Sequence, residues 1–245
     1  MSRIFLTGDL HGHVDIGKLI KFAKTNTGKS LNKQDYMIIL GDFGLVFHLS
    51  WSNKSELEYL EWLDKEAPWT TLFLDGNHEN FDRLDNYGIY PLEDFYGGQV
   101  SKINNSVLHL LRGQSYLIND ISFLVMGGAD SIDKNLRTPH YNWWIQEQIS
   151  HPQITNAIKT YDDVNFDFIL THCAPTSYVD DLYIKKLLLP GPRRISSSEK
   201  RLEKLKKHIY YKKWFCGHYH CEYDSPKFQT IYNKIIELPS PDSFY

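Results

Sequence analysis

The order of apolar segments near the amino terminus predicts an α/β protein built on a parallel sheet. Three short runs of β-branched, aromatic and aliphatic residues have the length of buried strands, and they occupy residues 4–7, 36–40 and 70–74. Over residues 14–24 and 54–65, apolar side chains recur at the spacing of an amphipathic helix. Strands and helices that alternate in this way favour parallel strands joined by right-handed crossovers.

The rest of the chain is richer in strands. Short strands are expected at 107–111, 115–118, 121–126, 166–170, 214–216, 228–232 and 235–238, and helical stretches at 143–149 and 197–211. Asn119 and Asp120 join two of these strands and are typical of a hairpin turn. Asp15 is expected to cap the first helix. The chain has no internal repeat and no low-complexity linker, so we expect a single domain over residues 1–245.

Composition excludes several classes of protein. The chain has 245 residues, of which 42% are apolar and 23% charged, as is ordinary for a soluble globular protein. A net charge of −3 gives no general attraction to nucleic acid or anionic membranes, and no apolar run reaches the ~18 residues of a membrane span. There is no signal-peptide pattern, and three irregularly spaced cysteines form no disulfide framework. We expect a cytoplasmic protein with no membrane partner; the sequence gives no oligomeric state.

Residues that can bind a metal follow five of the expected strands. The first strand breaks at Gly8, and Asp9 and His11 then point to the same side of an extended chain. The other strands are followed by Asp42, by Asn77 and His78, by His172, and by His218 and His220. Open α/β sheets bind ligands at these ends, and mixed oxygen and nitrogen donors suit divalent transition metals. The set exceeds the needs of one tetrahedral metal and suffices for two metals if one carboxylate bridges them.

The motifs Gly-Asp-x-His-Gly, Gly-Asp, Gly-Asn-His-Glu, Thr-His and Gly-His-x-His occur in this order between Gly8 and His220. Together they resemble the motifs of the calcineurin-like metallophosphoesterase superfamily. The resemblance implies an α/β/β/α sandwich of two mixed sheets flanked by helices. It also implies one metal held by Asp9, His11, Asp42 and His220, and a second held by Asp42, Asn77, His172 and His218. Asp42 would then bridge two divalent ions, with Mn²⁺ preferred over Fe or Zn²⁺.

The same resemblance implies the reaction and the substrate. Two dications ionise a shared water near neutral pH, and they neutralise the oxygens of the phosphate ester that this nucleophile attacks. His78 matches the histidine of the family that is not a ligand, contacts the phosphate and helps to protonate the leaving oxygen. The substrate is therefore expected to be a phosphate ester, and we favour phosphomonoesters.

Further residues outside the metal set concern the substrate. Arg137, in the loop 127–141, could grip a phosphate with two hydrogen bonds, or it could form a surface salt bridge. Trp143 and Trp144 could stack on a base, but adjacent side chains point differently, so at least one is expected in the core. Nine Lys and Arg residues lie between 193 and 213. A solvated helix face is the ordinary interpretation of this segment, and a rim that guides anions is the alternative.

Other functions stay open at this point. Asp42 is followed by Phe43 and Gly44, whereas the protein Ser/Thr phosphatases continue with Asp-Arg-Gly. A phosphoprotein phosphatase would therefore have to use Arg137 instead. Hydrolysis of phosphodiesters or nucleotides is a second alternative, and a metal-poor scaffold of the same fold is a third, although no ligand is missing. The kinase-like tripeptide Asp-Phe-Gly lacks the other kinase motifs.

Overall fold

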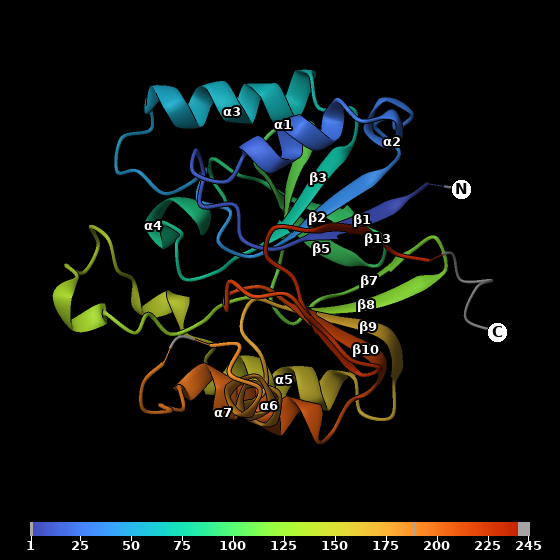
Figure 1. Cartoon of the computed structure of the whole chain (residues 1–245). Helices are drawn as coiled ribbons and strands as arrows, with labels where there is room; N and C mark the ends of the chain where they lie inside the picture. Colours follow the sequence, from blue (N-terminus) through green and yellow to red (C-terminus); the bar gives the residue numbers. More distant parts are fainter. Residues whose placement is uncertain (1, 189, 240–245) are drawn as a thin grey trace.

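Two mixed sheets lie face to face, and helices cover both outer surfaces (Figure 1). This computed structural model describes residues 2–188 and 190–239. The layers run helix, sheet, sheet, helix, which confirms the predicted α/β/β/α sandwich. No helix within the described residues is both long enough and apolar enough to cross a membrane.

The first sheet has seven strands in the order β13-β1-β2-β3-β6-β5-β4. They are β1 (Ile4–Thr7), β2 (Tyr36–Leu40), β3 (Thr70–Leu74), β4 (Leu92–Phe95), β5 (Gly98–Lys102), β6 (Val107–Leu110) and β13 (Ile235–Glu237). As predicted, β1, β2 and β3 are parallel. The chain crosses between them through α1 (Gly17–Ala23), α2 (Asn26–Lys29) and α3 (Lys54–Lys65), and α4 (Phe81–Leu84) follows β3.

The second sheet has six strands in the order β11-β12-β10-β9-β8-β7. They are β7 (Ser115–Ile118), β8 (Ile121–Met126), β9 (Asn165–Thr171), β10 (Tyr210–Cys216), β11 (Tyr223–Asp224) and β12 (Phe228–Thr230). Asn119 and Asp120 both have positive φ, as a tight hairpin turn between β7 and β8 requires. The helices α5 (His151–Thr160), α6 (Thr176–Ile184) and α7 (Ser197–Lys206) cover the outer face of this sheet (Figure 1).

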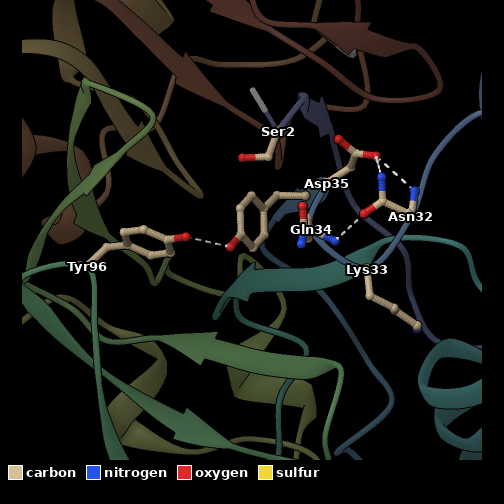
Figure 2. Close-up of a pocket in the computed structure, with 7 residues that line it drawn as sticks. Ser2, Asn32, Lys33, Gln34, Asp35 and Tyr96 are labelled. Atoms are coloured by element: carbon tan, nitrogen blue, oxygen red, sulfur yellow. Dashed lines mark hydrogen bonds between the residues drawn. The ribbon is translucent and has the colours of Figure 1, made fainter.

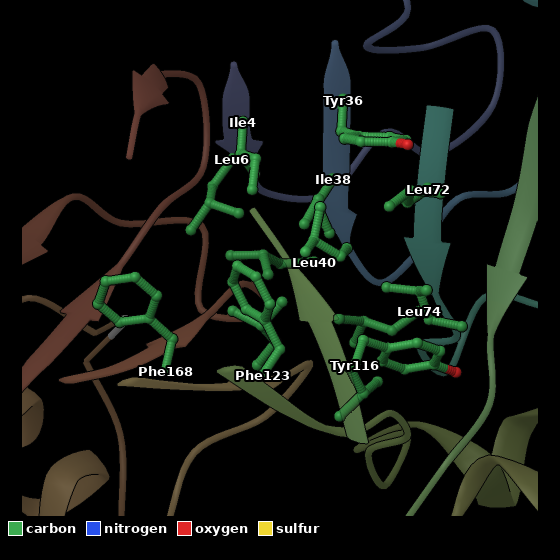
Figure 3. Close-up of a cluster of buried hydrophobic side chains, with 14 of the residues drawn as sticks. Ile4, Leu6, Tyr36, Ile38, Leu40, Leu72, Leu74, Tyr116, Phe123 and Phe168 are labelled. Carbon is green, nitrogen blue, oxygen red and sulfur yellow. The ribbon is translucent and has the colours of Figure 1, made fainter. Parts of the chain in front are cut away.

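Central strands such as β1 and β2 are apolar and buried on both faces, whereas the edge strand β4 is mostly exposed. In β2, Ile38 and Leu40 point into the core between the sheets, and Met37 and Ile39 point toward the helices of the first layer. Figure 3 shows side chains of the two sheets meeting in the central core. This burial on both faces explains why the strands lack the alternation of apolar and polar residues that marks a half-exposed strand.

Several predicted elements differ from those in the structure. The stretch 143–149 forms only a 3₁₀ turn, Ile145–Glu147, and the helix expected to reach residue 211 ends at Lys206 because the chain then enters β10. The helix α5 was not predicted, although Ser150 and Gln153 form a capping box at its start. The long connection expected after residue 175 contains α6, and the hairpin of β4 and β5 was also missed.

A cavity of about 380 Å³ lies at the amino-terminal end of β2 (Figure 2). Tyr36, the first residue of β2, and Tyr96 share a hydrogen bond of 3.1 Å between their hydroxyls. The Asp35 carboxylate accepts hydrogen bonds from the backbone nitrogen and the side-chain nitrogen of Asn32. The strand-end residues of the predicted metal set lie at the other end of these strands, so this cavity is remote from them.

Asp75 follows β3 and anchors the loop after β8. Its backbone oxygen accepts a hydrogen bond from Gly128 N, and its carboxylate accepts hydrogen bonds from Arg112 Nε (2.8 Å) and Nη2. His109 Nε2 lies 3.2 Å from the same carboxylate. Burial opposes ionisation of Asp75, but the Arg112 charge and the His109 contact outweigh burial and lower the pKa of Asp75.

This arrangement predicts a pH-dependent stability. Because the pKa of Asp75 is lowered on folding, its stabilising effect is present above the unfolded pKa of about 3.9 and is lost as the pH falls toward the folded pKa. We expect Asp75→Asn to reduce the free energy of unfolding at pH 7 by about 3–5 kcal/mol, because it leaves Arg112 buried without its counter-charge. Urea unfolding of both proteins at pH 7 and pH 3.5 measures this. A difference that did not shrink at the lower pH would contradict the assignment.

Candidate metal centre

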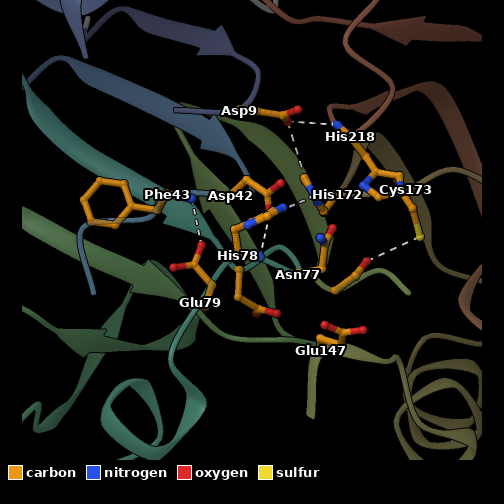
Figure 4. A network of polar contacts seen from close by, with 12 residues as sticks. Asp9, Asp42, Phe43, Asn77, His78, Glu79, Glu147, His172, Cys173 and His218 are labelled. Atoms are coloured by element: carbon orange, nitrogen blue, oxygen red, sulfur yellow. Dashed lines mark hydrogen bonds and ion pairs between the residues drawn. The ribbon is translucent and has the colours of Figure 1, made fainter. Parts of the chain in front are cut away.

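The carboxyl ends of strands from both sheets meet at one place (Figure 4). In the first sheet β1, β2 and β3 are parallel, so the segments that follow them leave at the same edge. In the second sheet β9 and β10 are parallel and end beside it. The eight residues singled out from the sequence follow these five strands: Asp9, His11, Asp42, Asn77, His78, His172, His218 and His220.

Asp42 lies between two groups of potential ligands. Sets of three residues whose ligand atoms lie within 4.8 Å of one another are Asp9, His11 and His220; Asp42, His172 and His218; and His11, Asp42 and His78. Asp42 Oδ2 is 3.3 Å from His11 Nε2, and Asp42 Oδ1 is 3.2 Å from His172 Nε2. One carboxylate thus faces an imidazole of each group, which is the position that a bridging ligand requires. His78 lies close enough to Asp42 that, by distance alone, it could bind the same metal ion.

Several atoms of this cluster that could bind a metal are buried without a good hydrogen bond. Asp9 Oδ2, Asn77 Oδ1 and His172 Nε2 are buried without a hydrogen bond of good geometry; Asp9 Oδ2 and His172 Nε2 face only other residues of the cluster, and such atoms are costly to bury unless another group satisfies them. His220 Nε2 also lies 3.0 Å from Asp9 Oδ2. Oxygen and imidazole donors that converge in this way are what a divalent transition metal binds. The residues present therefore fit a metal centre.

Two imidazoles are oriented through their second nitrogen. His11 Nδ1 lies 3.0 Å from Asp15 Oδ2, and His172 Nδ1 lies 2.8 Å from the backbone oxygen of Leu40. Both contacts direct Nε2 toward Asp42, as partners of metal-binding histidines do. The prediction that Asp15 caps the first helix was wrong. The N-cap residue of α1 is Ile16, which makes no side-chain cap, and the Asp15 carboxylate contacts His11 instead.

A buried chain of hydrogen bonds fixes the Asn77 amide. Asn77 Nδ2 donates to Ser131 Oγ (3.3 Å), and Ser131 Oγ donates to Glu147 Oε2 (2.8 Å). Glu147 is fully buried and also accepts from Ser131 N and Trp143 Nε1. With its nitrogen engaged, Asn77 keeps Oδ1 free to act as a ligand. Sequence reasoning missed Ser131 and Glu147, because no motif marks a residue that acts through another.

The backbone at the cluster is strained. His11, Asp42, His218 and His220 have φ angles of 46°, 46°, 68° and 47°. Such conformations of non-glycine residues cost on the order of 1–3 kcal/mol each, and they persist where the surrounding structure imposes them. Here the hydrogen bonds of His218 N to Asp9 Oδ1 and of His78 N to Asp42 Oδ1, both 2.8 Å, tie these loops to the carboxylates.

Glycines before the ligands make room for ligands from other strands. A Cβ atom on Gly41 would lie 2.2 Å from His172 Nδ1, and Gly41 has a φ of 92°. A Cβ atom on Gly217 would lie 2.2 Å from Asp9 Oδ1. The Gly-Asp and Gly-His motifs thus have a steric origin: the side chain missing at one position is the space that a neighbouring ligand occupies.

The carboxylates and imidazoles shift one another's pKa values. Burial opposes ionisation of Asp42, but His172 and His11 outweigh it and hold the pKa of Asp42 well below its usual value. Burial also lowers the pKa values of His11 and His172, but Asp42 outweighs it and raises both to about 9. Burial and the nearby His172 lower the pKa of His218 to about 4. Metal binding must displace the protons held by His11 and His172.

His78 has a different environment. Burial lowers its pKa, Asp42 acts in the opposite direction, and the positive charges of Arg137 and His11 lower it further. The net result is a pKa below the ordinary value of histidine.

A cavity of about 750 Å³ opens beside the cluster and is lined by Asp42, Asn77, His78 and Arg137. Arg137 therefore borders the cavity, and its guanidinium also forms the salt bridge that the sequence offered as the alternative. Its Nε lies 2.8 Å from Asp133 Oδ1, and its Nη1 donates to the Asn142 oxygen at 3.3 Å. Among the described residues, Nη2 has no hydrogen-bond partner. A two-point grip on phosphate would require Arg137 to exchange one of these contacts.

The other substrate-related segments are mostly structural. Trp144 is buried, as expected for at least one of the pair, and its Nε1 donates to Asp82. Neither Trp144 nor Trp143 is among the described residues that line the cavity, so neither forms a stacking platform there. In the basic segment, Arg193 pairs with Asp180 and Glu199, and α7 packs its apolar face on the second sheet. Arg194 does line the cavity.

A mixed α/β sandwich with carboxylates, an amide and imidazoles gathered at its strand ends defines a candidate metal-binding protein. The family model described as calcineurin-like phosphoesterase matches residues 2–222. The chain belongs to this family, and it is a metal-dependent phosphoesterase by family and by the chemistry of its site. A search of curated proteins finds no significant match.

Proposed function

We propose that this protein hydrolyses phosphomonoesters with two divalent ions that share Asp42. The first ion would be held by Asp9, His11, Asp42 and His220, and the second by Asp42, Asn77, His172 and His218. The observation that carries this proposal is the position of Asp42, whose two oxygens lie 3.3 Å and 3.2 Å from imidazole nitrogens of the two groups. Two metals close together need such a shared anion. Mn²⁺ is the preferred ion, and Fe or Zn²⁺ also suit the donors.

The residues around the ions have separate tasks. When bound, the two ions would supply an activated water and neutralise the charge of the phosphate. His78 borders both the cluster and the cavity, so that its ring can donate a hydrogen bond to the ester and deliver a proton to the leaving oxygen. Arg137 adds a positive charge at the cavity wall. Asp15, Ser131 and Glu147 would position the ligands through hydrogen bonds.

Metal content and substrate preference test the proposal together. We expect purified protein reconstituted with Mn²⁺ to bind close to two equivalents, and to hydrolyse an aryl phosphate monoester faster than a bis-aryl phosphodiester. One equivalent at saturation would contradict the shared carboxylate. Faster cleavage of the diester would favour a phosphodiesterase or nucleotide hydrolase, and the absence of both metal and turnover would favour a scaffold. Release of phosphate from a phosphoserine peptide would favour a phosphoprotein phosphatase.

Arg137→Ala is expected to slow monoester hydrolysis by about 10–100-fold, because a charged hydrogen bond to phosphate is worth about 1.5–3 kcal/mol. A diester carries less charge, so its hydrolysis should fall less. The measurement is kcat/KM for both substrates in both proteins. Lys200→Ala removes one exposed positive charge outside the cavity and should leave both rates unchanged. An unchanged ratio of the two rates in Arg137→Ala would remove Arg137 from the phosphate site.

Glu147→Gln is expected to weaken the metal position that includes Asn77. A glutamine oxygen can take the place of Oε1, which accepts from Ser131 N and Trp143 Nε1, but the amide nitrogen then replaces Oε2 and cannot accept from Ser131 Oγ. Loss of an outer partner typically costs 10–100-fold in metal affinity. Titration with Mn²⁺ should then show one equivalent that binds with the original affinity and a second that binds more weakly. Ser131→Ala, which removes only the hydroxyl, should have the same effect; two unchanged equivalents in both variants would contradict the role of this chain.

A further inference from the structure

A second cavity, of about 480 Å³, adjoins the metal centre. It is lined in part by His11, His78 and His220, and these three residues also line the larger cavity that contains Arg137. The two cavities therefore meet at the imidazoles of the cluster. A substrate whose phosphate lies at this junction can extend into either one.

Aromatic side chains form the walls of the second cavity. The Tyr232 ring stacks on His220, with centroids 4.5 Å apart and planes inclined by 9°. Lys18 fixes Tyr232 further, because its Nζ donates to the Tyr232 backbone oxygen at 2.7 Å. Phe47 lies with its ring 6.3 Å from the ring of His78 and 6.1 Å from that of Trp144. The lining thus includes two aromatic side chains, Phe47 and Tyr232, that are held in place by packing and hydrogen bonds.

The second cavity offers no lysine or arginine side chain to an anionic group, and its described lining is mainly imidazole, aromatic and aliphatic. The one carboxylate in this described lining, Asp15, is engaged with His11 Nδ1. The larger cavity differs, because it is lined by Arg137, Arg193 and Arg194. An anionic part of a substrate would therefore be bound in the larger cavity. The second cavity suits an uncharged, apolar group.

We propose that the second cavity binds the leaving group of the phosphate ester, and that this group is a planar, uncharged aromatic ring. The proposal rests on the proposed function, and it names the substrate class for the same site. His78 lines this cavity, so a proton donated by His78 can reach an oxygen that carries a group placed there. A monoester has a single organic group, which is the one that leaves. Aromatic walls favour a flat ring over a puckered one, because ring faces pack in offset or edge-to-face contact.

The test compares benzyl phosphate with cyclohexylmethyl phosphate. Both release a primary alcohol and differ chiefly in the planarity of the ring; comparison of each rate with that of Phe47→Leu removes the small difference in leaving-group acidity. We expect the Mn²⁺-loaded protein to hydrolyse the benzyl ester with a kcat/KM about three- to tenfold higher. Phe47→Leu, which keeps apolar volume but removes the ring face, should abolish most of this preference. Leu49→Ala changes an exposed residue of the same loop outside both cavities and should preserve it.

Binding of the non-hydrolysable benzylphosphonate and cyclohexylmethylphosphonate, measured by calorimetry, decides the proposal independently of turnover. Tighter binding of the benzyl compound, lost in Phe47→Leu, supports the aromatic subsite. Equal binding of the two compounds, or a preference unchanged in Phe47→Leu, overturns it. If the benzyl compound binds more tightly but no ester is hydrolysed, the proposed function fails and the subsite stands.

Discussion

Asp42→Asn is expected to lower metal occupancy at both positions and to leave little hydrolysis. The substitution keeps the size of the side chain, and its amide oxygen can still accept the hydrogen bond from His78 N that Asp42 Oδ1 accepts. What it removes is the negative charge between His11 and His172, which a shared ligand of two dications must supply. Metal content measured by plasma mass spectrometry, together with kcat/KM for an aryl phosphate, gives the result.

The control for this experiment is Asp82→Asn. Asp82 is a partly exposed carboxylate that binds Trp144 and His140 and does not line the metal cavity. The Asp82→Asn variant should retain two equivalents of metal and normal turnover. A variant at Asp42 that kept two tightly bound ions and full activity would show that this carboxylate is not shared.

His78→Asn should retain both metals and lose turnover selectively. Asparagine keeps a hydrogen-bond donor but cannot deliver a proton, so the variant separates contact with the phosphate from general acid catalysis. General acid catalysis is typically worth about 10²–10⁴-fold, and we expect a loss of this size for esters of poorly leaving alcohols. An activated aryl ester, whose phenolate leaves without a proton, should lose much less.

Two measurements distinguish His78 as an acid from His78 as a ligand. Its distance to Asp42 and His11 would permit ligation, so the metal content of the variant must be measured alongside its rates. Loss of one equivalent would make His78 a ligand. Equal losses of activity on both esters, with two metals retained, would leave His78 a role in binding phosphate only.

The sequence predicted the strand ends well because local chemistry and the fold agree there. Apolar runs such as 36–40 and 70–74 are buried on both faces, and each is followed by a glycine and a ligand that only the shared sheet edge brings together. The glycines were read as loop signals. In the structure they avoid a steric clash, because a side chain at Gly41 would collide with the ring of His172.

The parts that the sequence did not reveal depend on long-range contacts. Glu147 reaches Asn77 only through Ser131, which lies 54 positions from Asn77 along the chain. The second cavity combines Phe47 with Tyr232, from opposite ends of the chain. No local pattern carries such information.

The span of the ligands along the chain, from Asp9 to His220, has a consequence for biosynthesis. Asp9 leaves the ribosome about 210 residues before His220, which at 5–20 residues per second takes roughly 10–40 s. During this interval β1 also lacks its neighbour β13, which pairs with it only when residues 235–237 have been made. A nascent chain can therefore complete neither ligand set. Under the proposed assignment, ion selection must follow the synthesis of His218 and His220 and the pairing of β10 with β9.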